Sequence, residues 1–150
     1  MELAKNIRRA KRGDETQIMG LVHELALYEK APEEVINTPE QLAIDLFDDK
    51  ICDCFVYELD GAIRGIALYY ISYSTWRGRC LYLEDLYIQP AYRRGGIGRI
   101  LFQKLIDEAK TLKVKRMDWQ VLDWNEPAIK FYESIGATLD PEWINGRLFF

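Results

Sequence analysis

The stretch Arg93-Arg94-Gly95-Gly96-Ile97-Gly98 lies between an apolar segment typical of a β-strand and a longer segment with helical periodicity. Glycines in such a turn leave the backbone N–H groups open, so that several of them can close around one anion. The helix that follows adds its own unpaired N–H groups and the positive end of its dipole. Together these features predict a cradle for a pyrophosphate group. Taken alone, the stretch is equally consistent with a plain structural turn.

The segments on either side of this turn predict an α/β (α+β) fold. Period-two and period-3.6 patterns give the order β-α-α-β-β-β-α-β-α-β. An antiparallel meander followed by a β-α-β crossover gives a mixed, mostly antiparallel sheet with helices on both faces. We expect strands at Asn6–Ala10, Cys54–Leu59, Ala62–Tyr73, Cys80–Gln89, Arg116–Val121 and Ile144–Phe150, and helices from Asp14 to about Glu29–Ala31, from Thr38, at Ile97–Leu112 and at Asn125–Ile135.

Local signals mark several element ends. Asp14 is expected to cap the first helix, with Gln17 as its reciprocal partner. Thr38-Pro39-Glu40-Gln41 predicts the start of the second helix. Asp60-Gly61 predicts a tight hairpin turn, and Gly136 a left-handed helix C-cap.

Composition limits the class of protein. The 150 residues suit one domain, which we expect to span 1–150. A net charge of −4 lacks the basic excess of nucleic-acid binders. No stretch reaches the roughly 18 apolar residues that span a bilayer, and the N-terminus has no signal-peptide core. We therefore expect a cytoplasmic protein with neither nucleic acid nor membrane as partner. Three cysteines without a Cys-x-x-Cys pair, and a single histidine, predict no metal site.

A second motif lies downstream of the glycine-rich turn. Asn125, Ala128, Phe131-Tyr132 and Gly136-Ala137 follow at fixed spacing, and with the turn they resemble the GNAT superfamily of acetyl-CoA-dependent N-acetyltransferases. The resemblance runs from about Ile7 to Phe149. Further matches are similar to the spermidine/spermine (diamine) acetyltransferases, whereas two segments are closer to relatives that acetylate thialysine. The matches to the diamine acetyltransferases are 24–26 with 28–29, 67–70, 81–85 and 124–127. The segments closer to the thialysine relatives are Ser74-Thr75 and 121–125.

The resemblance implies acetyl-CoA as cosubstrate, with no metal. The coenzyme arm would pair with the strand backbone, and a backbone N–H there, that of Leu86, would face the thioester carbonyl. Losing such a donor typically costs about 3–4 kcal/mol. The implied coenzyme-binding residues are Leu86, Tyr87, Ile88, Arg93, Arg94, Gly95, Gly96, Ile97, Gly98, Asn125 and Tyr132.

Acetyl transfer also needs a neutral amine and a proton for the leaving thiolate. An alkyl ammonium has a pKa of roughly 10, so a neighbouring carboxylate must accept a proton. We expect Glu84 to be this base. Adjacent carboxylates on a strand point to opposite faces, so Asp85 joins the site only if a bulge intervenes, and the resemblance implies one. Tyr132 is the matching general acid.

The resemblance implies that substrate selection involves Tyr28 and Glu29, together with Glu84 and Asp85. The interpretation is transfer of an acetyl group to a primary amine of a small molecule, either a diamine or polyamine or a thialysine-like amino acid. Two alternatives remain: a non-catalytic acetyl-CoA-binding regulatory module, and an enzyme that acetylates protein N-termini or lysines. The resemblance further implies a homodimer, with the C-terminal strand and the Trp76 region near the interface.

Overall fold

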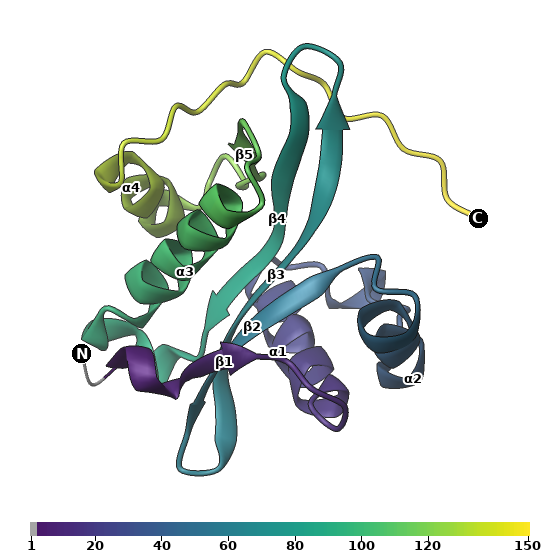
Figure 1. Ribbon diagram of the computed structural model, residues 1–150, viewed down its shortest axis with the longest axis vertical. Helices are drawn as coiled ribbons and strands as arrows, with labels where there is room; N and C mark the ends of the chain where they lie inside the picture. Colours follow the sequence, from purple (N-terminus) through teal and green to yellow (C-terminus); the bar gives the residue numbers. More distant parts are fainter. Residues whose placement is uncertain (1–2) are drawn as a thin grey trace. The chain divides into compact units, whose positions relative to one another are not determined.

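The computed structural model describes residues 3–150 and divides into two compact units, Met1–Trp119 and Gln120–Phe150. The first unit is built on a five-stranded sheet in the order β1-β2-β3-β4-β5 (Figure 1). Strands β1 to β4 are antiparallel and β5 is parallel to β4, which confirms the predicted mixed sheet. The strands are β1 Ile7–Arg9, β2 Asp53–Leu59, β3 Ala62–Ser74, β4 Gly78–Ile88 and β5 Met117–Asp118.

Helices cover both faces of this sheet (Figure 1). On one face, Ile18 of the helix α1 packs into a core with Cys54 and Val56 of β2. On the other face, Lys104 of α3 lies over the ring of Phe55, the intervening residue of β2. The helices are α1 Glu15–Tyr28, α2 Pro39–Ala43 and α3 Ile97–Thr111, with 3-10 turns η1 Leu3–Asn6, η2 Pro32–Glu34 and η4 Pro90–Gly95, and a π-helical turn, η3, at Ile44–Asp48.

Several local predictions are confirmed. Thr38 caps α2 by accepting a hydrogen bond from the Gln41 N–H at 3.1 Å. The Asp60-Gly61 turn has positive φ at both residues, as a tight hairpin requires. The helix α1 ends at Tyr28, one residue before the predicted end at about Glu29–Ala31.

The predicted capping box of α1 is wrong. Asp14 occupies the cap position but makes no side-chain cap hydrogen bond. Its carboxylate instead accepts from Arg8, at 2.7 and 3.1 Å, and from the Lys11 N–H. Gln17 accepts from the Ile63 N–H of β3 at 2.9 Å. Long-range partners outcompete the local cap because a charged guanidinium is a stronger donor than a backbone N–H.

The second unit contains one helix, α4 Glu126–Ser134. Asn125 caps it by accepting from the Ala128 N–H, and Gly136 follows it with φ +86°, as predicted. Two strand predictions are wrong: Arg116–Val121 is reduced to Met117–Asp118, and Ile144–Phe150 is no strand. A strand needs a neighbouring backbone, which an alternating pattern alone cannot supply.

Candidate active site

A β-bulge interrupts β4 in the middle of the sheet. Leu83 lies opposite Tyr69, and Asp85 lies opposite Leu68, so Glu84 has no partner residue on β3. An extra residue of this kind bends the strand and re-aims its side chains. The expected bulge is therefore confirmed, and Glu84 and Asp85 both line the same cavity.

This acceptor cavity has a volume of about 450 Å³. It lies among α1, the segment after η2, α2, η3, the residues that lead into β2, and strands β3 and β4. Three of the described lining residues carry carboxylates and none carries a basic side chain, while the rest are largely apolar. The lining residues are Met19, Val22, Val35, Asn37, Leu42, Asp45, Ile51, Cys52, Leu68, Tyr70, Glu84 and Asp85.

Burial and negative charge raise the pKa of several groups at or near this cavity. Burial, with the negative charges of Glu84 and Glu29, raises the pKa of Asp85 to about 7. Burial and Glu84 also raise the pKa of Glu29 and that of Tyr70. Within residues 3–150, no basic side chain forms an ion pair with Glu84 or Asp85. The cavity therefore carries negative charge that the protein leaves uncompensated, and such a site favours a cation.

The glycine-rich turn connects β4 to α3. Gly96 has φ +79°, a left-handed conformation that glycine adopts readily, and it caps the N-terminus of α3. The first helical bond runs from the Ile100 N–H to the Gly96 carbonyl, so the N–H groups of Ile97, Gly98 and Arg99 have no acceptor within the helix. The first turn contains no acidic residue. These features fit the phosphate groups of a ligand.

Arg93 is engaged within the protein. Its Nε donates to the Ile88 carbonyl at 2.7 Å, and its guanidinium lies 5.3 Å from the Tyr87 ring and 5.7 Å from the Tyr28 ring. Tyr87 in turn donates to Glu24 of α1 at 3.1 Å. The Arg93 side chain therefore fixes the end of β4. Neither Tyr28 nor Glu29, the two residues of the first helix predicted to bind substrate, lines the acceptor cavity.

Within the first unit, β4 has no partner strand on its outer edge beyond the bulge. The Gln89 N–H donates to Arg64 on β3, so by alternation the N–H groups of Ile88 and Leu86 point away from β3. On that side β5 pairs only with Leu81 and Tyr82 in the described first unit. Leu86 and Ile88 therefore offer backbone donors to an extended ligand at the strand edge.

The two remaining predicted site residues belong to the second unit. Asn125 is the α4 cap described above. Tyr132 is buried on α4, with its ring 5.4 Å from that of Phe131. Their roles toward a coenzyme remain predictions.

Sequence reasoning missed the far wall of the acceptor cavity, including Asp45 and Tyr70. Asp45 lies on η3, and helix periodicity gives no signal for a π-helical turn. Tyr70 lies on β3 directly opposite Tyr82, and the centroids of the two rings are 5.1 Å apart.

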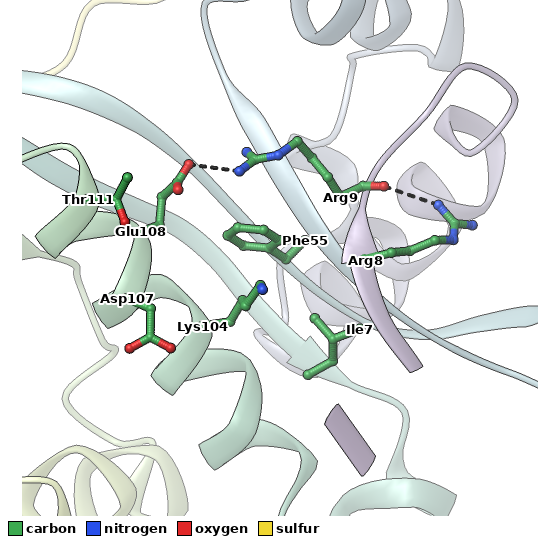
Figure 2. Close-up of a pocket in the computed structure, with 8 residues that line it drawn as sticks. All are labelled: Ile7, Arg8, Arg9, Phe55, Lys104, Asp107, Glu108 and Thr111. Carbon is green, nitrogen blue, oxygen red and sulfur yellow. Dashed lines mark hydrogen bonds and ion pairs between the residues drawn. The ribbon is translucent and has the colours of Figure 1, made fainter. Parts of the chain in front are cut away.

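A second cavity, of about 260 Å³, lies on the opposite side of the sheet (Figure 2). Two of its charged residues are paired: Arg9 bonds Asp53 and also Glu108, at 3.0 Å, and Tyr69 donates to Glu108 at 2.7 Å. This network ties β1, β2 and β3 to α3 and serves structure. In the part of the chain that the structure describes, no cluster of three potential metal ligands occurs and no helix is suited to span a membrane.

A mixed sheet with a bulged strand, a glycine-rich turn at that strand's end and an acidic cavity beside the bulge defines an acyl-transfer enzyme. The chain belongs to the acetyltransferase (GNAT) family, whose model matches residues 20–137. It is 40% identical over 135 residues to thialysine N-epsilon-acetyltransferase of Caenorhabditis elegans, covering 88% of this chain and 84% of that protein. It is 35% identical over 143 residues to human spermidine/spermine N(1)-acetyltransferase-like protein 1, covering 87% of this chain and 20% of that protein.

The fold is also found in solved structures. An aminoglycoside acetyltransferase from an uncultured soil metagenomic sample, in complex with trehalose, superposes with a TM-score of 0.78 at 19% identity. The likeness covers 96% of this chain and 95% of that one. At this identity the match concerns the fold alone, and the family relationship rests on the sequence comparisons.

Proposed function

We propose that this acetyltransferase moves an acetyl group from acetyl-CoA to a primary amine of a small molecule, by direct attack in a ternary complex. The observation that carries the proposal is the acceptor cavity, with its uncompensated carboxylates beside the open edge of β4. The substrates are a diamine or polyamine, or a thialysine-like amino acid. The names of the most similar relatives support this class of amine.

On the amine side, the carboxylates bind the cation and then receive its proton. An alkyl ammonium has a pKa of roughly 10, so making it nucleophilic at pH 7 requires about 4 kcal/mol. Glu84, the unpaired residue at the β4 bulge, is the proposed proton acceptor, directly or through one water. Asp85 binds the ammonium before transfer, and Glu29, whose negative charge also raises the pKa of Asp85, adds to the field that attracts the cation.

On the coenzyme side, acetyl-CoA would supply an acyl group activated as a thioester. The N–H groups of the Arg93–Gly98 turn and of the first turn of α3 are the proposed donors to its pyrophosphate. Leu86 and Ile88 would pair with the coenzyme arm through their backbone, and the Leu86 N–H would donate to the acyl carbonyl oxygen. Tyr132 is the proposed proton donor to the departing sulfur, and Asn125 a further contact to the arm.

A thiol-release assay with purified protein, acetyl-CoA and an amine panel tests this proposal. We expect release with small diamines or thialysine, and unchanged release in Glu33→Gln, an exposed acid outside the cavity. Coenzyme binding without release on any amine would favour the non-catalytic module. Release with peptides alone would favour a protein acetyltransferase.

A further inference from the structure

The carboxylate of Glu24, on α1, holds the joint between β4 and η4, the segment that leads into the glycine-rich turn. We infer that Glu24 is a positioning residue for acetyl-CoA, which fixes the outer edge of β4 relative to that turn. This inference rests on the proposed function, because it assumes that the coenzyme contacts both the β4 edge and the turn. It gives the first helix a part in coenzyme binding that acts through β4.

Gln89 is the joint, since it follows Ile88 at the end of β4 and precedes Pro90, the first residue of η4. Its N–H donates to the Arg64 carbonyl on β3, and its own carbonyl accepts from the Tyr92 N–H in η4, both at 2.9 Å. The backbone of Gln89 is thus bonded to the sheet and to η4. Its side chain offers a third point at which another element can hold the joint.

Glu24 uses both of its carboxylate oxygens at this place. Oε2 accepts from Gln89 Nε2, and Oε1 accepts from the Tyr87 hydroxyl, each at 3.1 Å. Residues two apart on a strand present their side chains on the same face, so both donors reach α1. Hydrogen bonds to a carboxylate are stronger than those between neutral groups. The end of β4 therefore has little freedom to move away from α1.

Arg93, within the glycine-rich turn, completes the connection. Its Nε donates to the Ile88 carbonyl at 2.7 Å, and its guanidinium lies 5.3 Å from the centroid of the buried Tyr87 ring. Glu24, Tyr87 and Arg93 thus form a connected series from α1 to the turn. Because the N–H groups of Leu86 and Ile88 point away from β3, this series sets their direction relative to the turn.

A ligand that contacts two surfaces at once depends on their relative position. The arm of acetyl-CoA would contact the β4 edge, and its pyrophosphate would contact the turn. Two contacts made by one molecule reinforce each other only where the geometry allows both at the same time. A loosened joint would have to become ordered on binding, which lowers the affinity. A ligand that contacts the turn alone does not depend on the joint.

Calorimetric titration with acetyl-CoA, and with ADP, which carries the pyrophosphate but lacks the arm, tests the inference. In Glu24→Gln an amide NH₂ group faces that of Gln89, so the joint loses its charged partner. We expect the Kd for acetyl-CoA to rise about tenfold, since a hydrogen bond to a charged group is lost, and the Kd for ADP to change by less than about twofold. His23→Gln, on the exposed neighbour in α1, should change neither value.

An unchanged Kd for acetyl-CoA in Glu24→Gln would overturn the inference. Equal weakening of both ligands would also overturn it, because a general loss of folded protein has that effect. If ADP fails to bind the unaltered protein, the proposed pyrophosphate site is wrong, and this inference fails with it.

Gln89→Met, which removes the other partner, gives an independent check should Glu24→Gln fold poorly, as judged by circular dichroism. It should weaken acetyl-CoA binding in the same selective way. The double variant should bind about as well as either single variant, because both changes remove the same interaction. Losses that add in the double variant would count against the inference.

Thiol release separates the two proposals. If the unaltered protein releases thiol and Glu24→Gln leaves the Kd for acetyl-CoA unchanged, this inference alone is refuted. If Glu24→Gln selectively weakens acetyl-CoA binding and no amine supports release, the catalytic proposal alone is refuted.

Discussion

The fold strongly changes the acidity of Asp85. Its pKa is raised to about 7, against 3.8 for an unperturbed aspartate, by burial and by the charges of Glu84 and Glu29. Between about pH 4 and pH 7 the folded protein therefore holds a proton that the unfolded chain has lost. The stability associated with this proton is complete below the unfolded pKa and is lost as the pH rises through the folded pKa.

Replacing this carboxylate should stabilise the protein at alkaline pH. Asp85→Asn is expected to raise the free energy of unfolding at pH 8 by at most about 4 kcal/mol, since one pKa unit corresponds to about 1.4 kcal/mol. Near pH 4 the variant and the unaltered protein should be equally stable. Urea denaturation at both pH values measures the difference. A gain of equal size at both values, or a loss at pH 8, would contradict the pKa of Asp85.

The proposed base has its own signature in the pH–rate profile. Glu84→Gln is expected to lower the rate at pH 7 by about 10²–10⁴-fold, the usual contribution of a positioned acid or base. Activity should recover at high pH, where solvent deprotonates the amine. A profile that superimposes on that of the unaltered protein would assign the base elsewhere. Glu33→Gln is the matched control.

The proposed acid is tested by removing one oxygen atom. Tyr132→Phe should depress kcat by about 10²–10⁴-fold, since the sulfur would leave without a positioned proton. The Kd for acetyl-CoA should change little, because the ring remains. Tyr73→Phe, on an exposed tyrosine of β3, should change neither quantity. An unaltered kcat in Tyr132→Phe would exclude Tyr132 from this role.

At the residue scale, sequence reasoning found groups that stand next to one another in the chain and missed groups that tertiary structure assembles. Glu84 and Asp85 stand out as adjacent acids on an apolar strand. Asp45 looks like one more acid on an amphipathic helix, because its placement depends on a π-helical turn. The Asp14 cap was mispredicted for the same reason, since its partner is Arg8 of β1.

At the scale of elements, the sequence predicts the order of β4, η4 and α3, because the residues that indicate these elements are neighbours in the chain. An apolar strand, a proline, a glycine-rich turn and a helical repeat follow one another directly. The β5 and C-terminal strands were mispredicted because strand pairing is non-local. For β5, pairing ends after two residues, at the point where the edge of β4 opens.

Adding a methyl group to the turn tests its conformation. Gly96→Ala should lower stability by about 1–2 kcal/mol, the cost of a left-handed conformation for a residue with a Cβ, and weaken acetyl-CoA binding. Gly95→Ala is the matched control, since Gly95 lacks a positive φ and its Cβ would also meet no atom within 4 Å. Urea denaturation and coenzyme titration measure both effects. Equal behaviour of the two variants would refute a special role for Gly96.

At the scale of the whole molecule, we propose that residues 1–150 work as one domain. The family model, which matches 20–137, runs across the boundary between the two compact units. Tyr132 lies beyond that boundary and Glu84 before it. The proposed base and the proposed acid therefore belong to different units of the chain.

Exposed apolar residues support the proposed homodimer. Trp76 is 88% exposed, and the aromatic residues of the C-terminal segment are similarly uncovered. Sedimentation equilibrium should give about twice the 17.6 kDa of one chain, because large exposed apolar groups are usually covered by a partner. Trp76→Ala, or deletion of Trp143–Phe150, should shift the equilibrium toward the single-chain mass. A single-chain mass for the unaltered protein would contradict the dimer.

The unmatched position of Glu84 means that the sheet itself has no need of this residue. On β4, Leu83 and Leu86 are three positions apart. Their partners on β3, Tyr69 and Ala67, are only two positions apart. Excising Glu84 would leave a shorter but regular ribbon in which every other side chain keeps its face. The acid is thus a removable insertion, and the gain or loss of a single codon could create or erase the proposed base while the scaffold persists.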